Sequence, residues 1–172
     1  MTGDLLSECH KSLSNHQLFF DGALKGNSGE AGAGGVLYCP NGEIEMKFTR
    51  GLGITSNNQY EALSFWKGLK MASSRGFRHI SIIKDSMIVI QICLKIKDQK
   101  EEDLLPIFLR IWILLKKFEV FYIYHVKREN NQIVDEQANR GANLEQGMVI
   151  LDHGTQSHAI FHENEKSLIK TS

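Results

Sequence analysis

Apolar residues recur at two different spacings along the chain, and the first spacing, an alternation, predicts strands. Residues 18–20 form a short apolar run that ends in an Asp-Gly pair and opens into a glycine-rich turn. Residues 34–39 (GGVLYC) resume the strand character, and residues 44–49 alternate apolar and polar side chains after a Pro-Asn-Gly turn. The first third of the chain therefore predicts three strands joined by tight connections.

From Ser56 onward the apolar residues recur at helical spacing, and Gly76 supplies a stop signal for that helix. A short β-branched run, HISIIK, then predicts a buried strand that is followed by an acid and another apolar, helical segment. The remaining pattern predicts two more helices with one strand between them. The ranges after the first helix are strand 79–84, helix 87–94, a charged linker 95–103, helix 104–118, strand 120–126 and helix 131–144.

This element order predicts an α/β fold with one mixed five-stranded sheet flanked by helices. The tight connections imply that the first three strands are antiparallel, and the helical crossovers imply that the later strands are parallel. We expect a polar N-terminal extension over 1–16, one domain over 17–146 and a C-terminal tail over 147–172.

The composition of the chain argues against some classes of protein but does not identify one. Lys plus Arg equals Asp plus Glu at 20 each among 172 residues, so any contact with nucleic acid must be local. No hydrophobic signal segment or membrane span is evident, and we expect an intracellular protein whose compartment the sequence does not distinguish. The three cysteines are widely spaced, which indicates reduced thiols and argues against a disulfide framework or a zinc site.

Four acidic residues fall at the ends of predicted elements: Asp21, Glu61, Asp85 and Asp135. Acids that follow neighbouring strands emerge side by side at one edge of an open α/β sheet. Carboxylates that converge without His or Cys favour Mg²⁺, with Mn²⁺ as an alternative. Two such ions can stabilise the attacking and leaving oxygens of a phosphoryl displacement, so the set indicates phosphodiester hydrolysis. Taken singly, each of the three aspartates could instead form a turn or cap a helix.

Five segments, in order, resemble the type 1 ribonuclease H family, especially its plant retrotransposon and reverse-transcriptase-associated forms. The resemblance covers residues 18–144 and is carried by FFDGALKGNSG, AGAGGVLYCPNG, TSNNQYEAL, IIKDS and HVKRENNQIVDEQAN. It implies a ribonuclease H-like fold, an endonuclease that cuts the RNA strand of RNA/DNA hybrids, and a monomer. It also implies that the four acids hold two divalent metal ions.

The resemblance further implies contacts with the substrate. Asn27 and Asn57 resemble positions that touch the minor groove of a hybrid, where 2′-hydroxyls distinguish RNA from DNA. His125 resembles a mobile histidine that helps product leave, although it could equally end the last strand. The remaining candidates for substrate contact, among which the asparagines could also be helix caps, are Gly22, Asn58, Ser86 and Asn131.

Departures from the family pattern keep a second function open. Lys84 precedes Asp85 where the family more often has Gly, and Ser28 stands where the turn often has Pro. These changes are expected to leave the metal centre intact and to affect hybrid affinity. The alternative is therefore a weak or inactive nucleic-acid-binding module derived from a retroelement polyprotein. A third class, the four-acid exonucleases, is disfavoured by the order of the motifs.

Overall fold

The computed structural model describes residues 15–26, 29–55, 59–84, 104–125, 132–153 and 157–163. The strands and helices of these segments follow one another in the order that the sequence predicts, as far as the last helix. No helix in the described segments has the length and apolar character needed to cross a bilayer. The elements are β1 (His16–Lys25), β2 (Glu30–Tyr38), β3 (Ile44–Ile54), α2 (Gln59–Ser73), β4 (His79–Lys84), α4 (Leu105–Leu115), β5 (Val120–His125), α5 (Gln132–Ala142), β6 (Met148–His153) and β7 (Ser157–His162).

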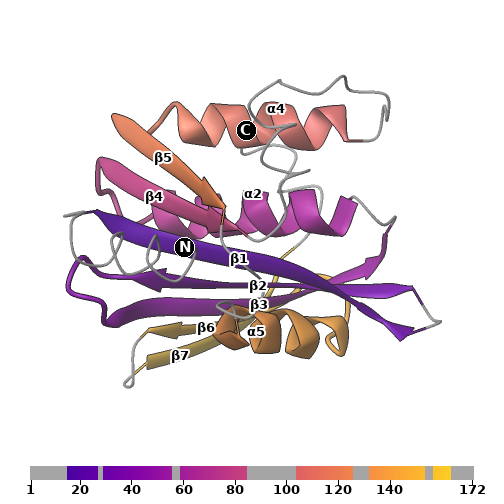
Figure 1. Ribbon diagram of the computed structural model, residues 1–172. Coiled ribbons are helices and arrows are strands. Elements are labelled where there is room, and N and C mark those ends of the chain that lie inside the picture. Colours follow the sequence, from indigo (N-terminus) through magenta and orange to yellow (C-terminus); the bar gives the residue numbers. More distant parts are fainter. Residues whose placement is uncertain are drawn as a thin grey trace.

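All seven strands form one mixed sheet in the order β5-β4-β1-β2-β3-β6-β7. Strands β1, β2 and β3 pair antiparallel, whereas β4 pairs parallel with both β1 and β5. Helices α2 and α4 lie on one side of the sheet and α5 lies on the other (Figure 1). The predicted α/β class and the change from antiparallel to parallel pairing are both confirmed.

The predicted strand count of five is wrong, because β6 and β7 extend the sheet beyond β3. Both strands fall in the segment that the sequence predicted as a tail. Their apolar residues form two short runs, 148–151 and 159–161, which do not alternate with polar residues, so the sequence lacks the usual strand pattern there. Strand β1 also runs five residues past the predicted end of its apolar run, and the helix predicted over 87–94 lies outside the described residues.

The glycine-rich segment is largely strand, and its glycines let helix α5 approach the sheet. A Cβ on Gly32 would lie 1.9 Å from the backbone nitrogen of Ala142, and one on Gly34 would lie 2.3 Å from that of Ala138. The intervening Ala33 is buried in the core on the opposite face. Alternating small residues thus let a helix backbone pack directly on β2.

Two apolar layers hold the helices to the sheet. The larger one joins α2 and α4 to the sheet around fully buried side chains such as Phe20, Phe65 and Ile111. The smaller one lies under α5 and consists of Phe19, Val36, Ile83 and Val134.

A buried ionic cluster ties the added strands to α2. Glu163 follows β7, and its carboxylate lies 3.3 Å from Arg50 Nε, 3.2 Å from Lys67 Nζ and 3.1 Å from Lys70 Nζ. Burial and the neighbouring Arg50 lower the pKa of Lys67 from 10.5 to about 7, although Glu163 opposes this change. Burial raises the pKa of Glu163, but the three cations outweigh it and the net shift is downward.

We expect Gly32→Ala to lower the free energy of unfolding by about 2 kcal/mol or more, because its methyl group would displace the α5 backbone. Urea denaturation measures the change. Gly68→Ala is the matched control, since its methyl group would lie 3.3 Å from the Leu18 side chain and alanine favours the helix. Equal destabilisation by the two substitutions would contradict the proposed role of β2.

The lowered pKa of Lys67 predicts that stability rises between pH 7 and pH 8.5. In this range the unfolded chain, with an ordinary lysine, binds more protons than the folded chain, so raising the pH favours folding. Urea denaturation of the wild type and of Lys67→Met at several pH values isolates this contribution. The unfolding free energy of the wild type minus that of Lys67→Met should increase as pH rises. A difference independent of pH would refute the prediction.

Candidate active site

Asp21 lies near the middle of the central strand β1 and is only 3% exposed. It is two residues after Phe19, so the strand alternation places both side chains on the α5 face of the sheet. The backbone N–H of Gly22 donates a hydrogen bond to Asp21 Oδ1 over 2.9 Å. A carboxylate in such a buried position requires a compensating positive charge.

Glu61 comes from the first turn of α2, on the other side of the sheet from α5. The helix reaches β1 closely because Gly22 has no side chain: a Cβ there would lie 2.3 Å from Tyr60 Cδ2 and 3.0 Å from Ser64 Oγ. Gly22 therefore determines how near Glu61 comes to the strand that carries Asp21.

Lys84, the last residue of β4, supplies the positive charge. Its ammonium nitrogen lies 2.7 Å from Asp21 Oδ1 and 3.1 Å from Glu61 Oε2. The Lys84 side chain is 0% exposed, and Nζ lies 5.4 Å from the centre of the Phe20 ring. Short ion pairs in a water-poor site are strong, and removing one partner leaves a buried charge uncompensated.

These residues fit a hard divalent cation. The described acids at this point offer only carboxylate oxygens, which Mg²⁺ and Mn²⁺ accept. The ammonium of Lys84 lies between two of those carboxylates, which indicates that a positive charge is favourable at this position. The sequence pattern did not predict this role of Lys84, which was expected to leave the metal centre intact and to affect hybrid affinity.

Two further candidates, Asp135 and His125, come from elements that pack on β1 or pair with β4. Asp135 lies in the first turn of α5, next to Val134, which packs in the same apolar layer as Phe19. Its Oδ2 accepts a long hydrogen bond of 3.5 Å from Asn139 Nδ2. His125 ends β5 opposite Lys84 in the parallel register and is exposed, so it lies at the edge of the sheet beside the buried lysine.

The structure describes only some of the predicted site residues. It brings Asp21 and Glu61 together through Lys84, and it places Gly22 between β1 and α2 as a packing residue. Roles of these residues toward metal or substrate remain predictions. The other candidates lie outside the described residues: Asn27, Asn57, Asn58, Asp85, Ser86 and Asn131.

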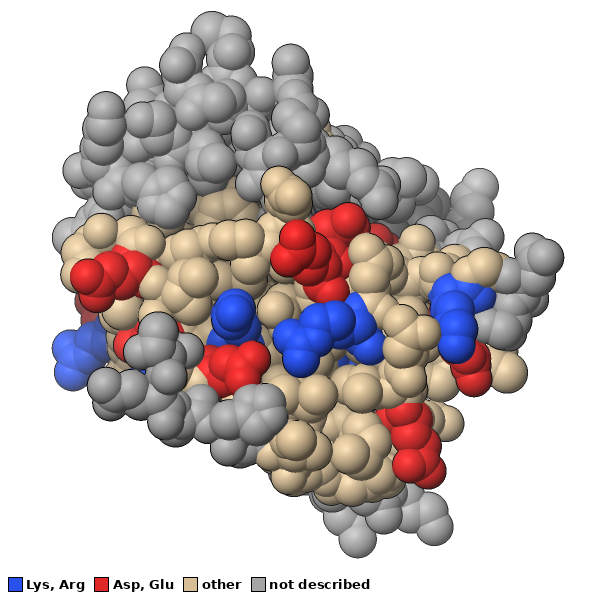
Figure 2. Space-filling view, turned by 90° about the horizontal axis from the view of Figure 1, so that it is seen from below, with Lys and Arg blue, Asp and Glu red and all other residues tan. Residues whose placement is uncertain are grey.

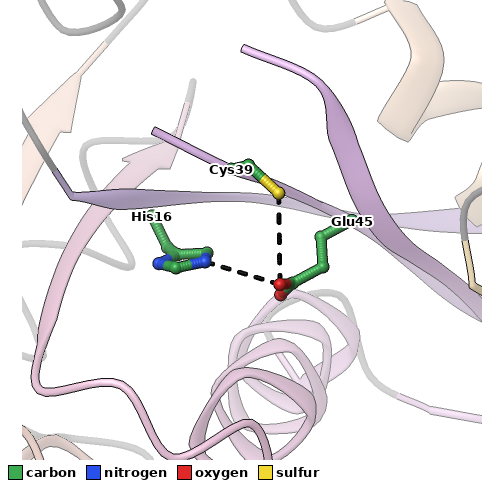
Figure 3. A group of neighbouring side chains, drawn as sticks. All are labelled: His16, Cys39 and Glu45. Atoms are coloured by element: carbon green, nitrogen blue, oxygen red, sulfur yellow. Dashed lines mark hydrogen bonds and ion pairs between the residues drawn. The ribbon is translucent and has the colours of Figure 1, made fainter. Parts of the chain in front are cut away.

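A second polar group, at the start of β1, is separate from these acids. Ligand atoms of His16, Cys39 and Glu45 lie within 4.8 Å of one another (Figure 3). His16 precedes Asp21 by five residues, about 16 Å along an extended strand. Arg75 Nε also lies 3.6 Å from Glu45 Oε2, and burial followed by the charges of nearby glutamates raises the pKa of Cys39. The carboxylate thus already has a cationic partner.

The underside of the molecule in Figure 1 carries mixed charges. Figure 2 shows Lys and Arg side chains interspersed with Asp and Glu, and the coloured atoms form no continuous basic surface on that face. This pattern agrees with the balanced composition of the chain.

The fold is that of a ribonuclease H-like protein. The crystal structure of RNase H1 from Halobacterium salinarum matches with a TM-score of 0.70 and 32% identity, covering 74% of this chain and 96% of that one. LC11-RNase H1, solved in complex with an RNA/DNA hybrid, has the same fold at a TM-score of 0.69 and 22% identity, covering 75% of this chain and 97% of that one.

A family model described as reverse transcriptase-like matches residues 19–141, and the chain belongs to this ribonuclease H family. Ribonuclease HI of Halobacterium salinarum is 34% identical over 121 residues, which are 70% of this chain and 61% of that protein. The bifunctional protein Rv2228c of Mycobacterium tuberculosis is 27% identical over 120 residues, 69% of this chain and 33% of that protein. The chain thus aligns with less than two thirds of either relative.

We expect Gly22→Ala to lower the free energy of unfolding by about 1–3 kcal/mol, because the methyl group would collide with Tyr60 and push α2 away from β1. A double-mutant cycle with Tyr60→Ala, measured by thermal or urea denaturation, tests the cause. Removing the Tyr60 ring should relieve part of the collision. The loss of unfolding free energy in the double variant should therefore be smaller than the sum of the losses in the two single variants. Simple additivity would contradict this account.

Proposed function

We propose that this chain is a metal-dependent endonuclease that hydrolyses the RNA strand of RNA/DNA hybrids. The observation that carries the proposal is the buried Asp21–Lys84–Glu61 group, in a protein of the ribonuclease H family. Named ribonucleases H among the relatives and the hybrid bound to LC11-RNase H1 support this substrate class.

The proposed metal ligands are Asp21, Glu61, Asp85 and Asp135. Divalent Mg²⁺ or Mn²⁺ bound by these carboxylates would supply the charge that stabilises the attacking and leaving oxygens of the phosphodiester. The partial exposure of Glu61, with 17% of its side chain accessible, gives the group a side from which ion and substrate can enter.

Neighbouring groups of the protein fix the position of the carboxylates. The N–H of Gly22 and the ammonium of Lys84 both bind Asp21 Oδ1, which fixes the carboxylate on its strand. Lys84 also reduces the electrostatic repulsion between Asp21 and Glu61. His125, at the exposed end of β5, is proposed to assist product release.

Hybrid recognition is assigned to the polar residues around the acids. Asn27 and Asn57 are proposed to bind the minor groove of the hybrid, where 2′-hydroxyls mark the RNA strand. The other proposed substrate contacts are Gly22, Asn58, Ser86 and Asn131.

Binding without cleavage is the second candidate function, and Lys84 is the observation that favours it. An ammonium that already pairs with two of the acids offsets one of their two negative charges and so weakens the attraction for divalent ions. Cleavage assays and hybrid-binding titrations on the same preparation separate the two candidates.

The purified chain should cut an end-labelled RNA/DNA hybrid in the presence of Mg²⁺ or Mn²⁺ and lose this activity in excess EDTA. Asp21→Asn should reduce the cleavage rate by at least 100-fold, because it removes a buried carboxylate ligand. Glu119→Gln is the matched control, since Glu119 is an exposed acid paired with Arg78 away from this group, and it should cut at the wild-type rate.

Gel electrophoresis of the labelled strand measures the rates, and thermal unfolding verifies that each variant is folded. If the wild type cuts nothing while an active ribonuclease H cuts the same hybrid, or if Asp21→Asn cuts as fast as the wild type, the endonuclease proposal fails. Salt-dependent binding of the hybrid without cleavage would instead support the second candidate.

A further inference from the structure

Three side chains that can bind a transition metal meet at the start of β1, apart from the proposed active site. His16 begins β1, Cys39 follows β2, and Glu45 is the second residue of β3. Glu45 Oε1 lies 3.5 Å from His16 Nε2 and 4.0 Å from Cys39 Sγ, and the three ligand atoms all lie within 4.8 Å of one another (Figure 3). One nitrogen, one sulfur and one oxygen ligand are thus gathered in one place.

Strand alternation brings the first two of these side chains to the same face of the sheet. His16 lies two residues before Leu18 on β1, and Cys39 lies two residues after Leu37 on β2. Both leucines belong to the larger apolar layer, so His16 and Cys39 are directed to that side of the sheet. The backbone N–H of Cys39 donates a hydrogen bond of 2.7 Å to the carbonyl of Glu43, which keeps the hairpin paired as far as Cys39.

A change of register in the sheet adds Glu45 to this pair. Leu37 pairs with Met46, but the next residue, Tyr38, pairs with Ile44, so Glu45 is an extra residue in β3. An extra residue of this kind is a β-bulge, which turns a side chain away from the direction that regular pairing would give it. The bulge explains how Glu45 meets side chains from β1 and from the end of β2.

Neighbouring groups orient two of the three ligands. The His16 ring stacks on Phe77, with the ring centres 3.8 Å apart and an angle of 5° between the planes. Arg75 Nε lies 3.6 Å from Glu45 Oε2, so the arginine engages one carboxylate oxygen while the other faces His16 and Cys39. Histidine and carboxylate ligands of protein metal sites are commonly held in place by outer contacts of this kind.

The separations fit a zinc ion. Zinc lies about 2.0–2.3 Å from its ligands, so in a tetrahedral site the ligand atoms are about 3.3–3.7 Å apart. The two distances from Glu45 Oε1 agree with this range to within a few tenths of an ångström. Imidazole and thiolate favour Zn²⁺ over Mg²⁺. The side chains of His16 and Glu45 are 20% and 22% exposed, so an ion can enter from solvent.

We propose that His16, Cys39 and Glu45 bind one Zn²⁺ ion, with a water molecule as the fourth ligand. Three protein ligands and one water form a known type of zinc coordination. Binding releases the thiol proton of Cys39 to solvent, because the thiolate is the form that binds metal. The ion fastens the start of β1 to the hairpin between β2 and β3. The wide spacing of the cysteines argued against a zinc site in the sequence, since the other two ligands come from different strands.

Co²⁺ is the probe for this site, because it replaces Zn²⁺ and shows an intense sulfur-to-cobalt absorption band only when a thiolate is bound. Titration of the reduced full chain should give this band with one Co²⁺ per chain, and one equivalent of Zn²⁺ should remove it. Cys39→Ser should lose the band. His16→Gln and Glu45→Gln should each weaken Co²⁺ binding by about 10-fold or more, because each removes a ligand.

Two matched controls assign the band to this group. A Cys9→Ser/Cys93→Ser double variant, in which Cys39 is the only cysteine, should keep the band. His79→Gln removes an exposed histidine at the start of the neighbouring strand β4 and should leave the affinity unchanged. Circular dichroism verifies that each variant is folded, and Cys39→Ala replaces Cys39→Ser if the latter is not.

The absence of the band in the wild type would overturn the inference. So would its survival in a folded Cys39 variant, its loss in the folded double variant, or unchanged Co²⁺ affinity in both His16→Gln and Glu45→Gln. Asp21→Asn should keep the band although it is expected to lose cleavage, so the zinc site and the proposed nuclease activity can fail independently.

Discussion

Two carboxylates can lie side by side in a buried place only when a positive charge lies between them, and this constraint organises the centre of the molecule. Asp21 comes from the middle of β1, Glu61 from the start of α2, and Lys84 from the end of β4. Three elements far apart in the sequence must therefore meet at this point. Salt bridges of this kind contribute little net stability relative to apolar packing, but a missing partner is costly, so the group favours one arrangement of its three elements.

Small residues make that arrangement possible on both faces of the sheet. Gly22 lets α2 approach β1, and Gly32 and Gly34 let the backbone of α5 lie directly on β2. The apolar layer of Phe19, Val36, Ile83 and Val134 then anchors the helix that carries Asp135. Close approach of backbones, more than large side chains, thus determines where the acids lie.

Periodicity and turn residues were sufficient to predict most of the fold. The buried strand 79–84 and the later helices have strong, regular patterns, and the structure places them within a few residues of the predicted ranges. The strands β6 and β7 were missed because edge strands bury few side chains, and β1 and β2 were shortened because glycines conceal strand character. The acids were found by their places at element ends. Lys84 was not found, because nothing in the local pattern shows that a lysine at the end of β4 turns into the core and meets two acids from other elements.

The ionic cluster around Glu163 has a consequence for where this protein can be divided. The family match ends at residue 141, and a fragment trimmed near that boundary would keep Arg50 and Lys67 but lose the carboxylate that all three surrounding cations share. Arg50 and Lys67 are 2% and 5% exposed in the intact fold, so the trimmed fragment would lose the carboxylate beside two buried cations and would also uncover the strand edge of β3. A boundary drawn from family resemblance alone would therefore yield a polypeptide inclined to self-associate, whereas one drawn after Glu163 keeps the sheet edge covered.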